Sequence, residues 1–202
     1  MMKRHSDGRR YKIILASNSP RRRELLSGLD LDYVVKVIPG IEEAYPHDLP
    51  AKNIPEFIAK EKAEPYIEDI GEDELILTAD TVVIVDGMIL GKPASEVDAK
   101  NMLRMLSGKT HQVVTGVCLT TKTIQRSFSV STDVTFKNLC DSEIDYYVRT
   151  YHPMDKAGAY GIQEWIGYVG VTSLNGSYYN VMGLPVQRIW EELKKMERYC
   201  EI

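Results

Sequence analysis

The sequence is poor in the residues that staple small secreted domains or build zinc sites. Its 202 residues include only three cysteines and four histidines. The cysteines, Cys118, Cys140 and Cys200, are odd in number and far apart, which argues against a disulfide framework or a zinc-type spacing. No two histidines are spaced as H-x-x-x-H, so a His-based zinc site and a Ser-His-Asp triad are both disfavoured. Unpaired cysteines are typical of a reducing compartment, and we expect a cytoplasmic protein.

Long apolar runs and a basic excess are also lacking. No stretch has the length and apolar character of a signal peptide or a membrane-spanning helix, so we expect no membrane partner. The formal net charge is −4, whereas nucleic-acid-binding domains are usually basic, so we expect no nucleic-acid partner. A small anionic substrate stays compatible with this charge, because a basic pocket can lie within an acidic surface.

The pattern of elements indicates one mixed α/β domain. Residues 1–10 are polar and basic and are predicted to be a disordered lead-in, and residues 11–202 are expected to form a single domain. Helical and strand patterns alternate along that range. Asp86-Gly87 is a strong signal for a tight hairpin, which implies antiparallel strands and a mixed sheet.

Local signals place the individual elements. The apolar run Ile13–Ala16 predicts a strand that is covered on both faces. Asn53 with Glu56 has capping-box spacing for a helix. A hairpin of 169–174 with 177–181 is expected about Asn175-Gly176. Further strands are expected over 33–38, 75–85, 88–90, 112–119 and 127–136, and further helices after Ser19, after Ser95, over 142–151 and from Pro185.

Four polar residues stand where the first strand leads into the first helix. Ser19 is a good N-cap with Pro20 behind it, so Ser17, Arg21 and Arg22 lie at or beside a helix N-terminus. Free backbone N–H groups there attract anions, and arginines in a first helical turn oppose the helix dipole unless an anion joins them. The residues suit a phosphate cradle. The alternative interpretation is a solvated run of charges.

Asp80 emerges from the apolar run 75–79, with Thr81 beside it. A carboxylate leaving a buried strand suits metal binding or general-base work, although such an Asp can simply cap a turn. Lys92 lies in Gly91-Lys92-Pro93 and is either a phosphate ligand or an ordinary loop lysine. Lys62 taken alone reads as a solvated helix lysine.

Two loop segments complete the candidates. Paired carboxylates such as Glu42-Glu43 can hold Mg²⁺, but such a pair is more often solvated. The segment 155–163 is rich in small residues and ends in Gln163, whose amide can both donate and accept, as recognition of a base requires. The alternative for this segment is a tight buried turn.

These pieces, in this order, resemble the Maf family. The resemblance covers about Lys12 to Leu193, and the combination is specific although each piece alone is weak. The matching stretches are Leu15–Arg22, Ala79–Val83, Gly91–Pro93, Leu106–Gly108, Asp155–Gln163 and Tyr179–Pro185.

The resemblance implies a fold similar to inosine triphosphatases: an elongated mixed sheet flanked by helices, with two lobes around a central cleft. It implies a nucleoside triphosphate pyrophosphatase that uses a divalent metal, Mg²⁺ or alternatively Mn²⁺. A homodimer and a link to cell-division arrest are expected at the family level. The implied roles are Asp80 as proton acceptor, Ser17, Arg22, Glu42, Lys62 and Lys92 around the phosphates and metal, and Arg21, Thr81 and Gln163 for selectivity in the branch that prefers dTTP and UTP.

Glu164-Trp165 departs from the family pattern, in which a glycine commonly follows the Gln163 position. This bulky pair is expected to reshape the base pocket. Asp80 could be the general base or a metal ligand, and the sequence does not separate these roles. The competing functions are a non-catalytic nucleotide-binding regulator of cell division and, against the charge balance, a nucleic-acid-binding module.

Overall fold

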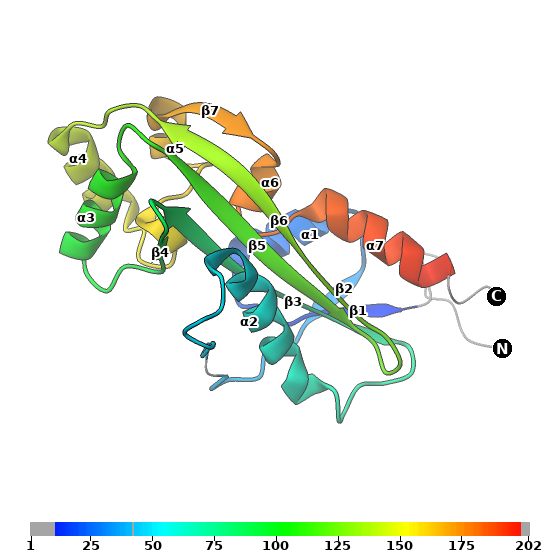
Figure 1. The fold of residues 1–202 in the computed structure, drawn as a ribbon. Helices are drawn as coiled ribbons and strands as arrows, with labels where there is room; N and C mark the ends of the chain where they lie inside the picture. Colours follow the sequence, from blue (N-terminus) through cyan, green and yellow to red (C-terminus); the bar gives the residue numbers. More distant parts are fainter. Residues whose placement is uncertain (1–10, 42, 199–202) are drawn as a thin grey trace.

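A computed structural model of the chain describes residues 11–41 and 43–198. The expected lead-in over 1–10 and the candidate ligand Glu42 lie outside the described residues. The described part is a mixed α/β structure built on one long, open, seven-stranded sheet with helices on both faces (Figure 1). The fold class expected from the sequence is therefore confirmed.

The strands run in the order β2-β1-β3-β5-β6-β7, with β4 beside β3. β1 pairs in parallel with β2 and β3, and the other pairs are antiparallel. The strand bounds are β1 Lys12–Leu15, β2 Tyr33–Val35, β3 Glu74–Val85, β4 Met88–Leu90, β5 Thr110–Thr120, β6 Gln125–Phe136 and β7 Val171–Asn175.

Helix α2 lies across one face of β3, β5 and β6, while α1 and α7 lie on the opposite face (Figure 1). Helices α3, α4 and α5 gather at one end of the sheet. The helix bounds are α1 Pro20–Ser27, α2 Ile54–Ala63, α3 Glu96–Leu106, α4 Asp141–Tyr151, α5 Trp165–Gly170, α6 Tyr178–Val181 and α7 Val186–Arg198, with 3-10 turns η1 Ala51–Asn53, η2 Glu64–Tyr66 and η3 Ala157–Ala159.

One edge of β3 is interrupted. β1 pairs with residues 74–77 of β3 and β4 pairs with 83–85, while β5 runs along the whole opposite edge from 76 to 84. The stretch 78–82 therefore has a strand partner on one side only. This gap in the sheet edge holds Asp80 and Thr81, and buried backbone groups there must find partners outside the sheet.

Side chains of β3 alternate between two different surroundings. Ile76, Val82 and Ile84 belong to apolar clusters on the α2 face, and Asp80 points to that same face. Leu77 and its odd-numbered neighbours pack into the larger core with α1 and α7. Asp80 and Thr81 thus face opposite sides of the sheet at the gap.

The expected hairpin over 169–181 is wrong. Residues 171–175 form strand β7, but Tyr178–Val181 is the short helix α6, and the Ser177 side chain accepts a hydrogen bond from the Asn180 backbone N–H at its start. The Asn180 amide is buried and donates to Val113 O and Thr132 Oγ1. These long-range contacts outweigh the local turn signal of Asn175-Gly176.

The expected cap at Asn53 is also wrong. Asn53 has helical backbone angles and makes no side-chain cap hydrogen bond, because the turn η1 already leads into α2. Glu56 accepts a hydrogen bond from Ser127 on β6. The second strand, expected over 33–38, ends at Val35.

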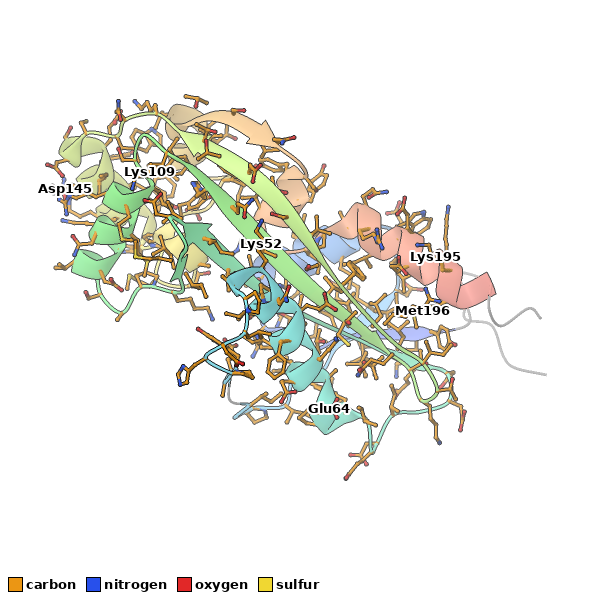
Figure 2. All side chains as sticks on the ribbon, in the orientation of Figure 1. Lys52, Glu64, Lys109, Asp145, Lys195 and Met196 are labelled. Carbon is orange, nitrogen blue, oxygen red and sulfur yellow. The ribbon has the colours of Figure 1, made fainter. Side chains whose placement is uncertain are left out.

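Side chains fill the space between the helices and both faces of the sheet (Figure 2). Within the described ranges, 11–41 and 43–198, no helix is both long enough and apolar enough to cross a bilayer.

Candidate active site

A cavity of about 770 Å³ opens at the gap in β3. Its wall is built from the start of α1, from α2, from β3 and from loops that include residues 37–41, 91–92, 155–163 and 182–183. The residues predicted to carry function, other than the undescribed Glu42, all line it: Ser17, Arg21, Arg22, Lys62, Asp80, Thr81, Lys92 and Gln163. The structure thus brings together side chains from five separated parts of the chain.

The start of α1 is shaped by two serines. Ser19 caps the helix, its side chain accepting a hydrogen bond from the Arg22 backbone N–H, as predicted. Ser17 is buried, and its hydroxyl oxygen accepts from the Ser19 backbone N–H. These bonds hold the strand-to-helix corner in one conformation at the cavity wall.

Arg22 ties three elements together at the gap. Its Nη1 donates to Ala79 O at 2.9 Å, which satisfies a carbonyl that has no strand partner. Its Nε donates to Gly183 O at 2.8 Å, and its Nη2 donates to Thr81 Oγ1 at 3.1 Å. Burial lowers the pKa of Arg22 and the nearby Asp80 carboxylate raises it, with burial the larger effect. Arg22 therefore acts as a brace: it links α1 to both β3 and Gly183 at the gap in the sheet edge. This structural role is separate from the phosphate role predicted for it.

Asp80, Lys62 and Glu43 form a charged triad on the α2 face. Lys62 Nζ lies 2.8 Å from Asp80 Oδ1 and 2.7 Å from Glu43 Oε1. Burial raises the pKa of Glu43, but the hydrogen bond and charge of Lys62 outweigh it, so the pKa is lowered. The interpretation of Lys62 as a merely solvated helix lysine is wrong, since its side chain is only 17% exposed and lies between two carboxylates.

Thr81 and Lys92 line the cavity in different ways. The Thr81 hydroxyl lies 3.0 Å from the Thr115 hydroxyl on β5 and accepts from Arg22, so it is held on the face away from Asp80. Lys92 is exposed and follows Gly91, whose carbonyl accepts from Gly158 N–H at 3.0 Å. This bond fixes the loop, while the Lys92 ammonium forms no ion pair within the described residues.

The segment 155–163 forms a further part of the cavity wall. Arg21 Nη1 lies 2.6 Å from Asp155 Oδ2, so the helix α1 and this segment are joined by an ion pair. Burial works to raise the pKa of Asp155, but hydrogen bonds from Lys156 and Arg21 lower it to about 2. Gln163 lines the cavity, and its Oε1 is buried with no hydrogen-bond partner among the described residues.

Sequence reasoning missed two residues that the geometry brings to the site. Glu43 was named only as one of a pair, and the resemblance assigned the role to Glu42, which lies outside the described residues. Glu164 was expected only to add bulk, whereas its carboxylate pairs with Lys156 and accepts from Tyr147. Tyr147 is 17 positions away on α4, so no local pattern could have revealed this contact.

The carboxylates suit a magnesium ion held jointly with a substrate. No group of three or more His, Cys, Asp or Glu side chains is arranged to hold a metal in the part of the chain that the structure describes. Asp80 and Glu43 each give one oxygen to Lys62, and the second oxygen of each carboxylate has no hydrogen bond to the described residues. Mg²⁺ prefers this kind of donor set, one or two carboxylates completed by phosphate oxygens and water.

A mixed sheet with an interrupted central strand, and a cavity lined by both cations and carboxylates, are typical of proteins that bind small phosphorylated ligands. The model of the Maf-like protein family matches residues 12–196, and the chain belongs to that family. The chain is 65% identical to a dTTP/UTP pyrophosphatase of Phocaeicola vulgatus over 93% of its length and 97% of that protein. It is 58% identical to a protein of the same name in Bacteroides thetaiotaomicron over 93% and 97%, and 46% identical to one in Flavobacterium johnsoniae over 92% and 95%.

Proposed function

We propose that this protein hydrolyses dTTP and UTP to the nucleoside monophosphate and pyrophosphate, by attack of water on the α phosphorus. The observation that supports this most is the Asp80–Lys62 ion pair, which lies in a cavity that is also lined by the start of α1. The relatives that are 46–65% identical over nearly the whole chain are named dTTP/UTP pyrophosphatases.

In the proposed reaction Asp80 accepts the proton from the attacking water. Lys62 holds Oδ1 of this carboxylate, which leaves Oδ2 for the water. The alternative role, in which Asp80 serves as a metal ligand, uses the same oxygen. Asp80 and Glu43, with Glu42 as the resemblance implies, would hold Mg²⁺, whose positive charge would offset that of the phosphates.

The cations of the cavity match the charge of the substrate. A nucleoside triphosphate carries about four negative charges near pH 7. Arg21, Lys62 and Lys92 come from three different elements of the cavity wall, and together they can contact several phosphates. Arg21 and Lys62 are each paired with carboxylates, so substrate binding must compete with those ion pairs.

Direct attack by water is favoured over a covalent intermediate. The hydroxyl of Ser17 accepts from a backbone N–H, and that of Thr81 lies between Arg22 and Thr115. Among the described residues, neither hydroxyl is hydrogen-bonded to a carboxylate or a histidine that could activate it, which covalent catalysis by serine or threonine requires.

The function is tested by a screen of ordinary and modified nucleoside triphosphates with Mg²⁺. We expect pyrophosphate and monophosphate from dTTP and UTP, with no orthophosphate formed directly. EDTA should stop the release, and Mg²⁺ or Mn²⁺ should restore it. A protein that binds dTTP but releases no pyrophosphate would favour the non-catalytic regulator, and tight, salt-sensitive binding of RNA or DNA would favour the nucleic-acid-binding module.

We further propose a cytoplasmic location, supported by the odd number and wide spacing of the three cysteines and by the proposed nucleotide substrate. The homodimer and the link to cell-division arrest remain proposals that rest on the family resemblance. Cell fractionation, light scattering of the purified protein and cell-length measurements after overexpression would test the three separately.

A further inference from the structure

A continuous chain of polar contacts runs behind the segment 155–163. Arg21 pairs with Asp155 at 2.6 Å, and Asp155 Oδ1 lies 2.8 Å from Lys156 Nζ. Lys156 Nζ lies 3.1 Å from Glu164 Oε1, and the other oxygen of Glu164 accepts from the Tyr147 hydroxyl. The chain therefore links α1 to α4 through both ends of the segment that carries Gln163.

Burial makes this chain rigid. Tyr147 is fully buried and the Lys156 side chain is only 9% exposed. A buried lysine needs opposite charges, and Lys156 has two, from Asp155 and Glu164. Burial and the Glu164 carboxylate raise the pKa of Tyr147 above its usual value. The hydroxyl therefore stays protonated and donates a hydrogen bond to Glu164. Glu164 is thus the link that satisfies both neighbours.

The same residues enclose Gly161. Its backbone N–H donates to the Tyr147 hydroxyl at 2.9 Å. A methyl group at Gly161 would lie 2.9 Å from the Glu164 Cδ and 3.1 Å from the Lys156 Cε, so these two side chains pack directly against its backbone. Gly161 is two residues before Gln163, and Glu164 is the residue after it. The backbone that carries Gln163 is therefore held on both sides.

Gln163 is the group in this segment suited to read a base. Its Oε1 is buried, lacks a hydrogen-bond partner among the described residues and belongs to a side chain that lines the cavity. A buried acceptor without a partner is destabilising, and a ligand N–H that donates to it removes that cost. A uracil or thymine ring offers such an N–H at N3. The recovery depends on where the backbone places the amide.

We propose that Glu164 is a positioning residue that fixes segment 161–163, through Tyr147 and Lys156, so that Gln163 discriminates between bases. The inference rests on the proposed function for the identity of the ligand. Loss of the carboxylate leaves the Lys156 ammonium with one counter-charge and the Tyr147 hydroxyl without its acceptor. Segment 161–163 then moves, and the Gln163 amide no longer meets the pyrimidine in one orientation.

The test measures binding without turnover. Calorimetry with Mg²⁺ gives dissociation constants for the non-hydrolysable α,β-imido analogues of dTTP and dGTP, and their ratio is the discrimination. We expect Glu164→Ala to lower that ratio at least tenfold, and Glu164→Gln, which can still accept from Tyr147, to lower it less. Tyr147→Phe should also lower it. A merely structural role would weaken binding of both analogues equally and leave the ratio unchanged.

A matched control comes from another ion pair on α4. Asp145 lies 2.7 Å from Lys100 at the outer end of the molecule (Figure 2), and Asp145→Asn should keep the ratio within twofold of the wild type. A ratio within twofold in a folded Glu164→Ala protein overturns the proposal, as does a wild type that does not discriminate between the analogues. If Glu164→Ala does not fold, the ratio for Glu164→Gln tests the proposal in its place, and an unchanged ratio in that variant also overturns the proposal.

The outcomes separate this inference from the proposed function. A wild type that discriminates between the analogues but releases no pyrophosphate from dTTP contradicts the enzyme and leaves the role of Glu164 standing. A wild type that releases pyrophosphate, together with variants of unchanged discrimination, contradicts only the role of Glu164.

Discussion

Lys62 on α2 and Asp80 on β3 form an ion pair with their Nζ and Oδ1 atoms 2.8 Å apart, at the point where the edge of the sheet is interrupted. The pair exists because the side chains of β3 alternate: Val82 lies in an apolar cluster with Ala51, just before α2, and Asp80 points to the same face of the sheet. Apolar burial thus brings the helix to the sheet and sets a charged pair at the cavity wall.

Lys62→Met should lower kcat/KM for dTTP on the order of 100-fold, because it removes a cation from the carboxylates and from the phosphates. Steady-state kinetics of pyrophosphate release would measure this loss. Lys60→Met is the control, since Lys60 is on the same helix and, in the part of the chain that the structure describes, its ion pair is with Glu56 at 3.5 Å. Equal kinetics for the two variants would remove Lys62 from the reaction.

Arg22→Lys should lower the free energy of unfolding by about 2 kcal/mol, because one ammonium cannot serve Ala79 O, Gly183 O and Thr81 Oγ1 together and a buried carbonyl loses its partner. Urea denaturation monitored by fluorescence would show the change. Arg23→Lys is the comparison, because within the described residues the Arg23 side chain donates a single hydrogen bond, to Asn18. An Arg22 variant as stable as the wild type would contradict the bracing role.

Gln163→Ala should change base preference more than turnover, because the buried amide lines the cavity and has no protein partner for its Oε1 within the described chain. The kcat/KM values for dTTP, UTP and dGTP would be compared, and the ratio between pyrimidine and purine should fall about tenfold. An unchanged ratio, whatever the absolute rates, would take Gln163 out of the base pocket.

His111 should make stability depend on pH between about 6.5 and 4. Its Nε2 lies 2.7 Å from the Tyr160 hydroxyl in the protein interior, and burial lowers its pKa to about 4. The unfolded chain binds this proton below about pH 6.5, whereas the folded protein does not until about pH 4. Its contribution to stability is therefore complete above pH 6.5 and is lost as the pH falls, by on the order of 3 kcal/mol.

Urea denaturation at pH 7, 5 and 4 would measure this dependence. The His111→Gln variant should lose less stability than the wild type between pH 7 and 4. His47→Gln, which changes an exposed histidine, should follow the wild type. The same pH slope in all three proteins would exclude His111 as its source.

The sequence predicted those parts of the fold that depend on local chemistry. The Ser19 cap and the Ser95 cap are confirmed, and so is the turn at Asp86-Gly87, where both residues have positive φ. The predicted cap at Asn53 and the predicted hairpin about Asn175-Gly176 were wrong, because groups distant in the sequence determine the structure at both positions. A buried amide at Asn180 that binds two neighbouring strands cannot be inferred from the residues next to it.

The candidate site follows the same division. Residue types and resemblance were enough to nominate Asp80, Arg21 and Gln163, which all line one cavity. The role of Arg22 as a brace could not be predicted, because it depends on the Ala79 carbonyl, which has no partner in a neighbouring strand and accepts from Arg22 instead. The contact of Glu164 with Tyr147 likewise depends on how α4 packs beside the 155–163 segment.

The most direct test compares pyrophosphate release from dTTP, with Mg²⁺, by the wild type and by Asp80→Asn. The amide keeps the size of the side chain but is a far weaker base and a poorer metal ligand than the carboxylate. We expect steady release by the wild type and a loss of at least 1,000-fold in the variant, on the order seen when a catalytic acid–base group is removed. Release at the same rate by both proteins would contradict the placement of the reaction at this carboxylate.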